Sequence, residues 1–360
     1  MTTAPATPTE INAAPRFFGF RLAPMSIRRI QKFRANSRAY YSLLIFLALL
    51  IFSLFAEFVA NDRPLVVSYQ GSLYFPVVKD YPETAFGGSF ATEANYRNPW
   101  VRQKIEAEGW MIWPPIPYSY ETTITDLPFP APSAPDGVNW LGTDDQARDV
   151  MARVIYGFRI SVLFGVALTI ATTVIGVLAG SVQGYFGGWT DLLFQRFLEI
   201  FGSLPGLFIL IILASIIPPS VTSLFTILLI FGWTWPVGYV RAEFLRVRNL
   251  EYVRAAKALG MSDWRVMKKH ILPNAMVTTL TFLPFQLGSS VTILTSLDFL
   301  GLGLPPGSPS LGELLNQGKN NLQAPWLGIT GFVVTGTMLV LLIFAGEAIR
   351  DAFNPRKTAK

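Results

Sequence analysis

The stretch 160-ISVLFGVALTIATTVIGVLAGSV-182 contains no charged residue. At a rise of about 1.5 Å per residue, a helix of this length crosses a hydrocarbon core about 30 Å thick. Hydrophobic residues make up 51% of the chain and charged residues only 14%. Five further apolar runs are long enough to cross the membrane, either alone or together with flanking residues: 42–60, 192–217, 221–240, 276–300 and 327–344. The sequence therefore predicts an all-α membrane protein with six transmembrane helices.

The run 192–217 is the least regular of the six. Arg196 and Glu199 lie inside it, and Pro205 and Gly206 interrupt it. Charges three residues apart can pair on one helix face, which reduces the cost of about 2.5 to 3.5 kcal/mol for an ion at mid-membrane. We expect a paired structural contact, with the charged half of the run near an interface.

Lys and Arg are distributed unequally around the predicted spans. Residues 1–39 hold seven bases and one acid, and the tail after the last span is also basic. Residues 61–157 hold twelve acids and seven bases, whereas residues 241–272 hold eight bases and three acids. The positive-inside rule then places both termini in the cytoplasm and a large external loop between helices 1 and 2. The net charge of +6 reflects this orientation and contact with anionic membrane lipid, not nucleic-acid binding.

Several chemistries are excluded by missing residues. The chain has no cysteine, so disulfides, thiolate metal sites and cysteine nucleophiles are ruled out. It has no Gly-x-x-x-x-Gly-Lys-Ser/Thr loop to hold ATP phosphates. His270 is the only histidine and has no converging ligands nearby in the sequence, so we expect a structural role for it and neither metal nor cofactor. These features fit a multi-pass protein of a bacterial inner membrane.

The basic loop between the fourth and fifth spans predicts a helix. Tyr252, Ala255, Ala256 and Leu259 recur at i, i+3, i+4 and i+7. Gly260 follows where a helix ends in a left-handed residue, a conformation that costs glycine nothing.

A second short helix is predicted to begin near Asp263, with Ser262 as its cap. Trp264, Met267 and Ile271 form its apolar stripe, and Pro273 and Asn274 are expected to end it before the fifth span. Two amphipathic helices meeting at a glycine bend favour docking of another protein. Contact with lipid headgroups is the alternative.

The spacing Ala255-Ala256-x-x-x-Gly260, with His270-Ile271-Leu272-Pro273 after it, resembles the coupling loop of ABC importer permeases. Arg254 stands where that family often has Glu, and His270 where it has Ile. The form His-Ile-Leu-Pro-Asn and the segments 141–161 and 298–303 look like the peptide and nickel branch, and the closing stretch 346–356 is similar to the family's C-terminal signature. Segments 61–66 and 74–79 are similar to the Yej-type subgroup, whose importers carry oligopeptides and microcin C.

The resemblance implies a division of the chain. It comprises a cytoplasmic N-terminal segment 1–39, transmembrane helix 1 at 40–60 and a periplasmic loop or domain 61–157. An ABC permease core 158–348 follows, with five transmembrane helices and the cytoplasmic coupling loop 241–275, and then the cytoplasmic tail 349–360. The implied partners are a second permease subunit in a heterodimer, a cytoplasmic ABC ATPase, a periplasmic peptide-binding protein and a peptide substrate.

The resemblance also implies roles for single residues. The following residues would couple the chain to the ATPase: Arg254, Ala255, Ala256, Gly260, His270, Leu272 and Pro273. ATP-driven closure of that partner would push the helix pair as a rigid unit and alternate access to a pathway through the membrane. A secondary transporter, which would work without ATPase subunits, and more distantly a membrane-embedded hydrolase are the alternative functions.

Three acids need a separate interpretation. Asp298 follows an apolar span that contains Ser289 and Thr292, so it either faces the substrate pathway and contacts a cationic peptide or closes a helix end near the outer interface. Asp144 and Asp145 lie in a Gly-Thr-Asp turn and are expected to cap the helix that follows rather than to bind a metal.

Overall fold

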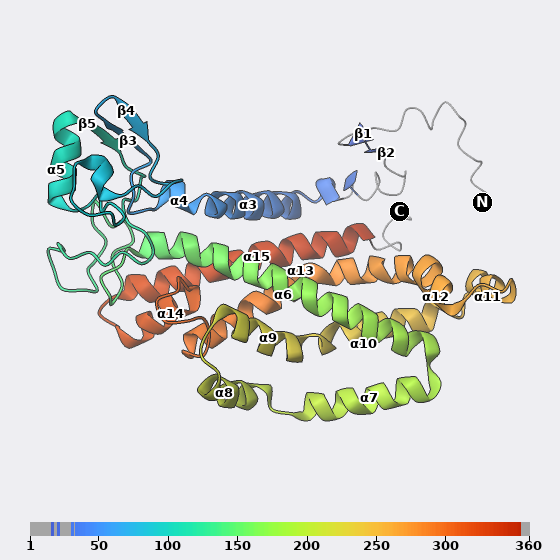
Figure 1. Ribbon diagram of the computed structural model, residues 1–360. Helices are drawn as coiled ribbons and strands as arrows, with labels where there is room; N and C mark the ends of the chain where they lie inside the picture. Colours follow the sequence, from blue (N-terminus) through green and yellow to red (C-terminus); the bar gives the residue numbers. More distant parts are fainter. Residues whose placement is uncertain (1–15, 18–19, 22–29, 32, 354–360) are drawn as a thin grey trace.

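A computed structural model describes residues 16–17, 20–21, 30–31 and 33–353 (Figure 1). Most of the predicted segment 1–39 and the end of the predicted tail, 354–360, lie outside these residues. Within the described part, two short strands, β1 (Arg16–Phe17) and β2 (Phe20–Arg21), pair with each other near the start of the chain.

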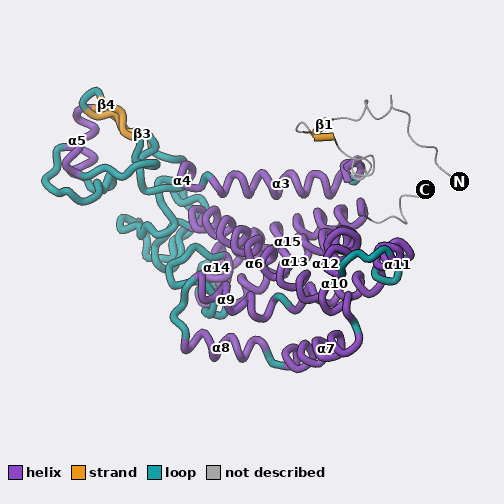
Figure 2. The backbone as a smooth tube through the Cα atoms, turned by 45° about the vertical axis from the view of Figure 1, so that its right-hand side comes forward, coloured by secondary structure: helices purple, strands orange, loops and turns teal. Residues whose placement is uncertain are grey.

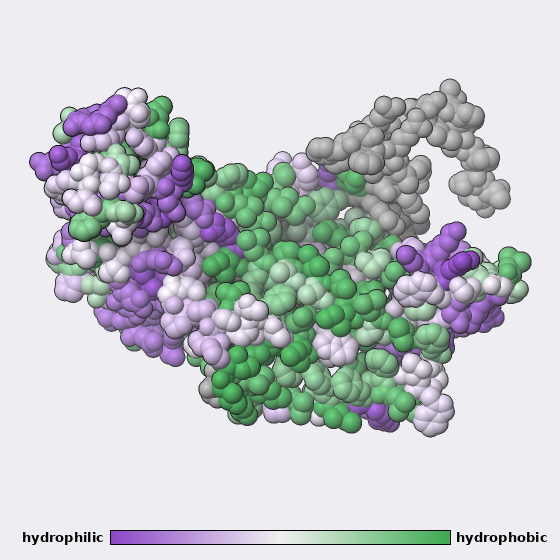
Figure 3. Space-filling view, in the orientation of Figure 1, coloured by the Kyte–Doolittle hydropathy of each residue, from purple (hydrophilic) through white to green (hydrophobic). Residues whose placement is uncertain are grey.

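Long helices run side by side and form the bulk of the molecule (Figures 1 and 2). They are α3 (Ser37–Leu54), α6 (Val150–Phe186), α9 (Val221–Gly232), α10 (Thr234–Val247), α13 (Leu272–Phe299) and α15 (Pro325–Phe353). Among the residues that the structure describes, five helical stretches are long and apolar enough to cross a membrane: Ser37–Leu54, Val150–Phe186, Val221–Val247, Asp263–Phe299 and Pro325–Phe353. Figure 3 shows the hydrophobic belt that these helices present on their outer surface.

The predicted single helix 192–217 is wrong, because two helices occupy that run. They are α7 (Gly188–Ser203) and α8 (Gly206–Ile216), and each is too short to span a bilayer alone. Proline disfavours helical backbone in the residue before it, and Leu204 adopts an extended conformation there. The expected pairing is present, since Arg196 Nη1 lies 2.6 Å from Glu199 Oε2.

The region between α3 and α6, which includes the predicted external loop 61–157, contains a small sheet and a helix. Three antiparallel strands lie in the order β4 (Ser72–Tyr74), β3 (Val66–Tyr69) and β5 (Gly109–Ile112). The helix α5 (Pro99–Glu108), a short α4 (Ala56–Val59) and the 3-10 turn η1 (Glu83–Phe86) complete this part. One face of the sheet packs on α5 and η1 around Val67, Phe86 and Ile105.

Glycines bring α6 and α10 into close contact. A Cβ at Gly176 would lie 2.6 Å from Pro236 Cβ, and a Cβ at Gly184 would lie 2.6 Å from Phe244 Cβ. Gly180 lies between them and faces Val240 at a similarly short distance. Small residues at intervals of four allow helix backbones to approach in a membrane, where dispersion contacts replace the hydrophobic drive. This contact fixes α10, and with it the start of the cytoplasmic loop.

Candidate functional site

The first helix of the predicted coupling loop is α11 (Glu251–Ala258), and it ends just before the predicted glycine. Gly260 has φ +82°, and nothing lies within 4 Å of the position a Cβ would take. The Met261 N–H donates to Ala256 O over 3.2 Å, and the Gly260 N–H donates to Lys257 O over 3.0 Å. These bonds satisfy carbonyls at the helix end in the usual left-handed closure.

The second helix does not end at Pro273. A short α12 (Asp263–Val266) passes through the π-helical turn η2 (Met267–Ile271) into α13 without a break. In the turn the Leu272 N–H donates to Met267 O, five residues back. Pro273 has no N–H, and it lies in the first turn of α13, where a proline is tolerated. The second helix therefore begins at Asp263 as predicted, but its predicted end is wrong, because α12, η2 and α13 form one continuous helical stretch. Ser262 precedes α12 but makes no side-chain cap bond.

The packed face of α11 differs from the predicted stripe. Val253 and Ala256 are buried, whereas Tyr252 and Leu259 are 44% and 88% exposed. Val253 belongs to a cluster of buried side chains from α10, α12, η2 and α13. In the second helix Met267 and Ile271 are buried, but Trp264 is 64% exposed. Large apolar side chains thus remain uncovered on a basic loop outside the membrane-spanning belt. Such residues commonly mark a protein interface.

Polar contacts fasten the loop to the end of α6. Lys257 Nζ lies 3.1 Å from Asp263 Oδ1, and the Tyr185 hydroxyl donates to the same carboxylate oxygen. Arg248 Nη1 donates to the carbonyl oxygens of Gly184 and Tyr185 over 3.1 and 3.0 Å. The sequence analysis missed these residues, since no local spacing connects α6 with a loop more than 60 positions away.

The two departures from the family pattern have different surroundings. Arg254 is exposed on α11. The His270 carbonyl accepts from Asn274 Nδ2 over 3.1 Å, and its ring lies 6.3 Å from the Tyr252 ring. Within the described residues, no group of three His, Cys, Asp or Glu side chains is placed to hold a metal.

A stripe of hydroxyl groups lies on the outer face of α13. Ser289, Thr292 and Ser296 are exposed along this helix. Ser289 and Thr292 donate to carbonyls one turn back, Phe285 O and Gly288 O, over 3.1 and 2.9 Å. Ser289 and Ser296 also line a cavity of about 360 Å³ between α6, α8, α9 and α13. We refer to Ser289, Thr292 and Ser296 as the hydroxyl stripe.

Behind the hydroxyl stripe, polar side chains join α13 to α6. Gln286 Nε2 donates to Thr172 Oγ1 over 2.7 Å, and Thr173 Oγ1 donates to Gln286 Oε1 over 3.1 Å. Ser290 and Thr169 hydroxyls lie 3.2 Å apart. Hydrogen bonds of this kind hold membrane helices in register.

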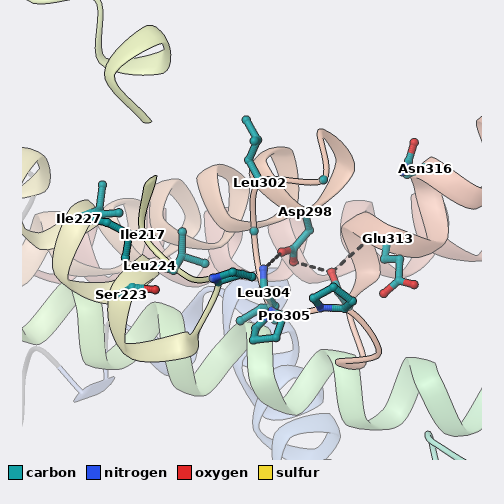
Figure 4. A pocket seen from close by; sticks show the side chains of 15 residues that line it. Ile217, Ser223, Leu224, Ile227, Asp298, Leu302, Leu304, Pro305, Glu313 and Asn316 are labelled. Carbon is teal, nitrogen blue, oxygen red and sulfur yellow. Dashed lines mark hydrogen bonds between the residues drawn. The ribbon is translucent and has the colours of Figure 1, made fainter. Parts of the chain in front are cut away.

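Asp298 lies at the external end of α13 and holds the loop that follows. Its Oδ1 accepts from the Leu304 N–H over 2.7 Å, and its Oδ2 accepts from the Ser310 hydroxyl (Figure 4). The Ser310 hydroxyl in turn caps α14 (Leu311–Asn320) through the Gly312 and Glu313 N–H groups. Asp298 also lines a cavity of about 310 Å³. Both carboxylate oxygens thus have partners within the chain.

A buried ion cluster lies beside this cavity. Arg153 and Asp144 are fully buried, with Arg153 Nε 3.4 Å from Asp144 Oδ2 and Arg153 Nη2 2.9 Å from Glu313 Oε2. Arg148 Nη2 lies 2.7 Å from Asp144 Oδ2. The cluster ties the segment before α6 to α14, since a charge buried in this way needs a partner.

The expected helix cap at Asp144 or Asp145 is wrong, because Asp149 is the residue that caps α6. Asp149 Oδ1 accepts from the Ala152 N–H over 2.8 Å. Asp144 Oδ1 instead accepts from the Gln146 and Arg148 N–H groups within its own turn. The carboxylate that caps a helix must directly precede its first turn, and only Asp149 does so.

Residues 172–359 match the family described as "Binding-protein-dependent transport system inner membrane component". This chain belongs to that family of permeases. It is 56% identical over 99% of its length to all of the "Peptidoglycan transport system permease protein YejE" of Agrobacterium fabrum. It is 57% identical over 94% of its length to 99% of the "Inner membrane ABC transporter permease protein YejE" of Escherichia coli.

A more distant relative supports the same branch. The permease is 34% identical over 61% of its length to 76% of the "Oligopeptide transport system permease protein OppC" of Lactococcus lactis. The chain is therefore an inner-membrane permease subunit of an ABC importer, as the coupling-loop motif predicts. The family description assigns such chains to transport, and ATP hydrolysis belongs to separate subunits.

Proposed function

We propose that this permease moves peptides across the inner membrane as half of a heterodimer with a second permease. A cytoplasmic ABC ATPase would supply the energy, and a periplasmic peptide-binding protein would deliver the substrate. The relatives' names support peptide cargo, because they cite oligopeptide and peptidoglycan transport. Peptide fragments of the cell wall and peptide compounds such as microcin C fall in this substrate class.

The observation that carries the proposal is the continuity of the loop with the fifth span. Tyr252, Leu259 and Trp264 offer an uncovered apolar surface, while Val253 joins α11 to a buried cluster with residues of α10, α12, η2 and α13. A partner that moves this surface would displace α12, η2 and α13 together, because no bend separates them. The displacement would reach the hydroxyl stripe, which includes the proposed pathway residues Ser289 and Thr292.

The proposed topology has six crossings with both termini in the cytoplasm. Five crossings are made by the long helices, and α7 and α8 together make the third as a broken helix. In Figures 1 and 2, α7 starts at the end of the bundle that carries α11, and α8 ends near α14. Broken helices at membrane depth are tolerated where protein covers the irregular backbone.

The mechanism is tested by replacing Gly260 with valine in the assembled complex. A β-branched residue at φ +82° is strained, although the surrounding space is empty. We expect peptide uptake into proteoliposomes to fall at least about tenfold, as a shift of 1.4 kcal/mol or more in coupling would give.

The matched control is Gly71→Val, which has a similar φ of +76° and equally empty surroundings in the external region. It should leave coupling intact. Full substrate-stimulated ATPase activity and uptake in the Gly260 variant would refute the coupling mechanism. Uptake by the permeases without ATPase subunits would instead favour a secondary transporter.

A further inference from the structure

The three-stranded sheet of the external region has one covered face and one open face. Val67 lies opposite Tyr74 on β4 and Met111 on β5, and this row packs toward α5. Side chains alternate between faces along a strand, so the residues on either side of this row point the other way. The open face is formed by Val66, Ser68, Leu73, Phe75, Trp110 and Ile112.

This open face is apolar although nothing in the described chain covers it. Leu73, Phe75, Trp110 and Ile112 are 59%, 46%, 49% and 49% exposed. Leu73 lies on β4 and Phe75 directly follows that strand, whereas Trp110 and Ile112 lie on β5. The partly exposed Val66 and Ser68 of β3 lie between them, so these residues together form a patch on one face of the sheet. Such patches on soluble surfaces mark contacts with a membrane or another molecule.

The position of the sheet favours contact with the membrane over contact with another molecule. Only six residues separate the end of α4 at Val59 from the start of β3 at Val66, which limits the distance between these two residues to about 25 Å. In Figure 1 the sheet lies between α5 and the external end of α3, so the face opposite α5 is turned toward the membrane-spanning belt. Figure 3 shows hydrophobic surface on this side of the external region.

We propose that the open face rests on the outer surface of the lipid bilayer beside α3. The lipid-facing surface of α3 continues toward the sheet through Phe55 and Phe58, which are 57% and 46% exposed. Trp110 has the amphipathic ring that collects at membrane interfaces. The exposed Lys79, which follows the exposed Val78 after β4, adds a positive charge for lipid phosphates. The contact does not depend on what the permease transports.

The absence of native cysteine allows the contact to be measured on the whole importer. Leu73→Cys and Ile112→Cys would each carry a nitroxide label in complexes reconstituted into phosphatidylethanolamine and phosphatidylglycerol vesicles. Glu106→Cys, which is exposed on α5, is the matched control. We expect labels 73 and 112 to collide preferentially with oxygen and the label at 106 with an aqueous nickel chelate.

Equal access of the nickel chelate to all three labels would overturn the proposal. A protein occupant would be indicated if labels 73 and 112 were accessible to water in vesicles and became shielded only after addition of the periplasmic binding protein. That outcome would also overturn it. Labels 73 and 112 lie on opposite edge strands, so each gives an independent result if the other variant does not assemble.

Discussion

Asp149 and Asp298 are both buried carboxylates at helix ends, but their partners differ. Asp298 has donors for both oxygens, from Leu304 and Ser310. Asp149 has the Ala152 N–H for Oδ1, whereas its Oδ2 is buried without a hydrogen-bond partner. Asp298 therefore positions the loop that follows it, whereas the buried, unpaired oxygen of Asp149 carries an electrostatic cost in the folded state.

Burial raises the pKa of Asp149 from its ordinary value of 3.8 to about 6. The folded state then binds a proton more tightly than the unfolded chain, so this group lowers the free energy of unfolding as pH rises from about 4 to about 6. Asp149→Asn keeps an acceptor for the cap and removes the charge. At pH 7 we expect it to stabilise the protein by on the order of 1 to 3 kcal/mol, with less effect at pH 4.

Thermal unfolding of the purified protein across this pH range measures the difference. Asp149→Ala is the control, because it removes the charge and the cap together and should lose about 1 kcal/mol relative to Asn. A stability difference between wild type and Asp149→Asn that is the same at pH 4 and pH 7 would contradict the assignment.

For Asp298 we predict a structural effect rather than a change in substrate preference. Asp298→Ala leaves the Leu304 N–H and the Ser310 hydroxyl without their acceptor, which should cost about 1 to 3 kcal/mol. Asp298→Asn retains an acceptor, and the ratio of cationic to neutral peptide uptake should stay unchanged. A selective loss of cationic peptide uptake in the Asn variant would show instead that the carboxylate contacts substrate.

At the scale of elements, the contact between α6 and α10 holds the start of the coupling loop. Gly176, Gly180 and Gly184 form one side of it, and Val240 and Phe244 the other. Arg248, which follows α10, donates to the Gly184 carbonyl of α6, and the Tyr185 hydroxyl on α6 donates to Asp263 of the loop. The contact that packs α6 against α10 therefore also holds the start of the coupling loop.

Gly180→Leu should disrupt this support, because a Cβ there already meets Val237 O and Val240 Cβ at 2.9 Å. Overpacking of this kind costs about 1 to 3 kcal/mol and shifts the helices apart. Gly238→Leu on α10 is the matched control, since nothing lies within 4 Å of its Cβ position. We expect a lower melting temperature for the first variant and little change for the second; equal melting temperatures would argue against a tight contact.

At the scale of the molecule, the broken helix decides the topology. Six crossings require the segment before α7 and the segment after α8 to lie on opposite sides of the membrane. Single cysteines at Trp189, which is 77% exposed, and at Pro219 test this arrangement. A membrane-impermeant thiol reagent should label the cysteine at 219 from outside intact cells and the one at 189 only after permeabilisation. Labelling of both from the same side would mean that α7 and α8 form a re-entrant hairpin.

The sequence by itself determined five long apolar spans, the charge asymmetry, the motif of the permease family and the left-handed turn at Gly260. These features depend on hydropathy, charge and local backbone preference, and residues close together in the sequence determine all three. The wrong expectations concern contacts between distant segments or competition between local rules. Proline at 273 suggested a helix end, but a π turn lets the helix continue past it.

Only the tertiary structure decided which side of each element is covered. Val253 and Ala256 are buried rather than the whole predicted stripe, and Val253 packs into a cluster with residues of α10, α12, η2 and α13. Asp144 pairs with Arg153 and thereby with Glu313, some 160 positions further along the chain. The open face of the external sheet likewise depends on where α5 packs. Periodicity in the sequence predicts that a face is apolar. Only the packing of distant elements determines which part of that apolar face stays exposed for a partner.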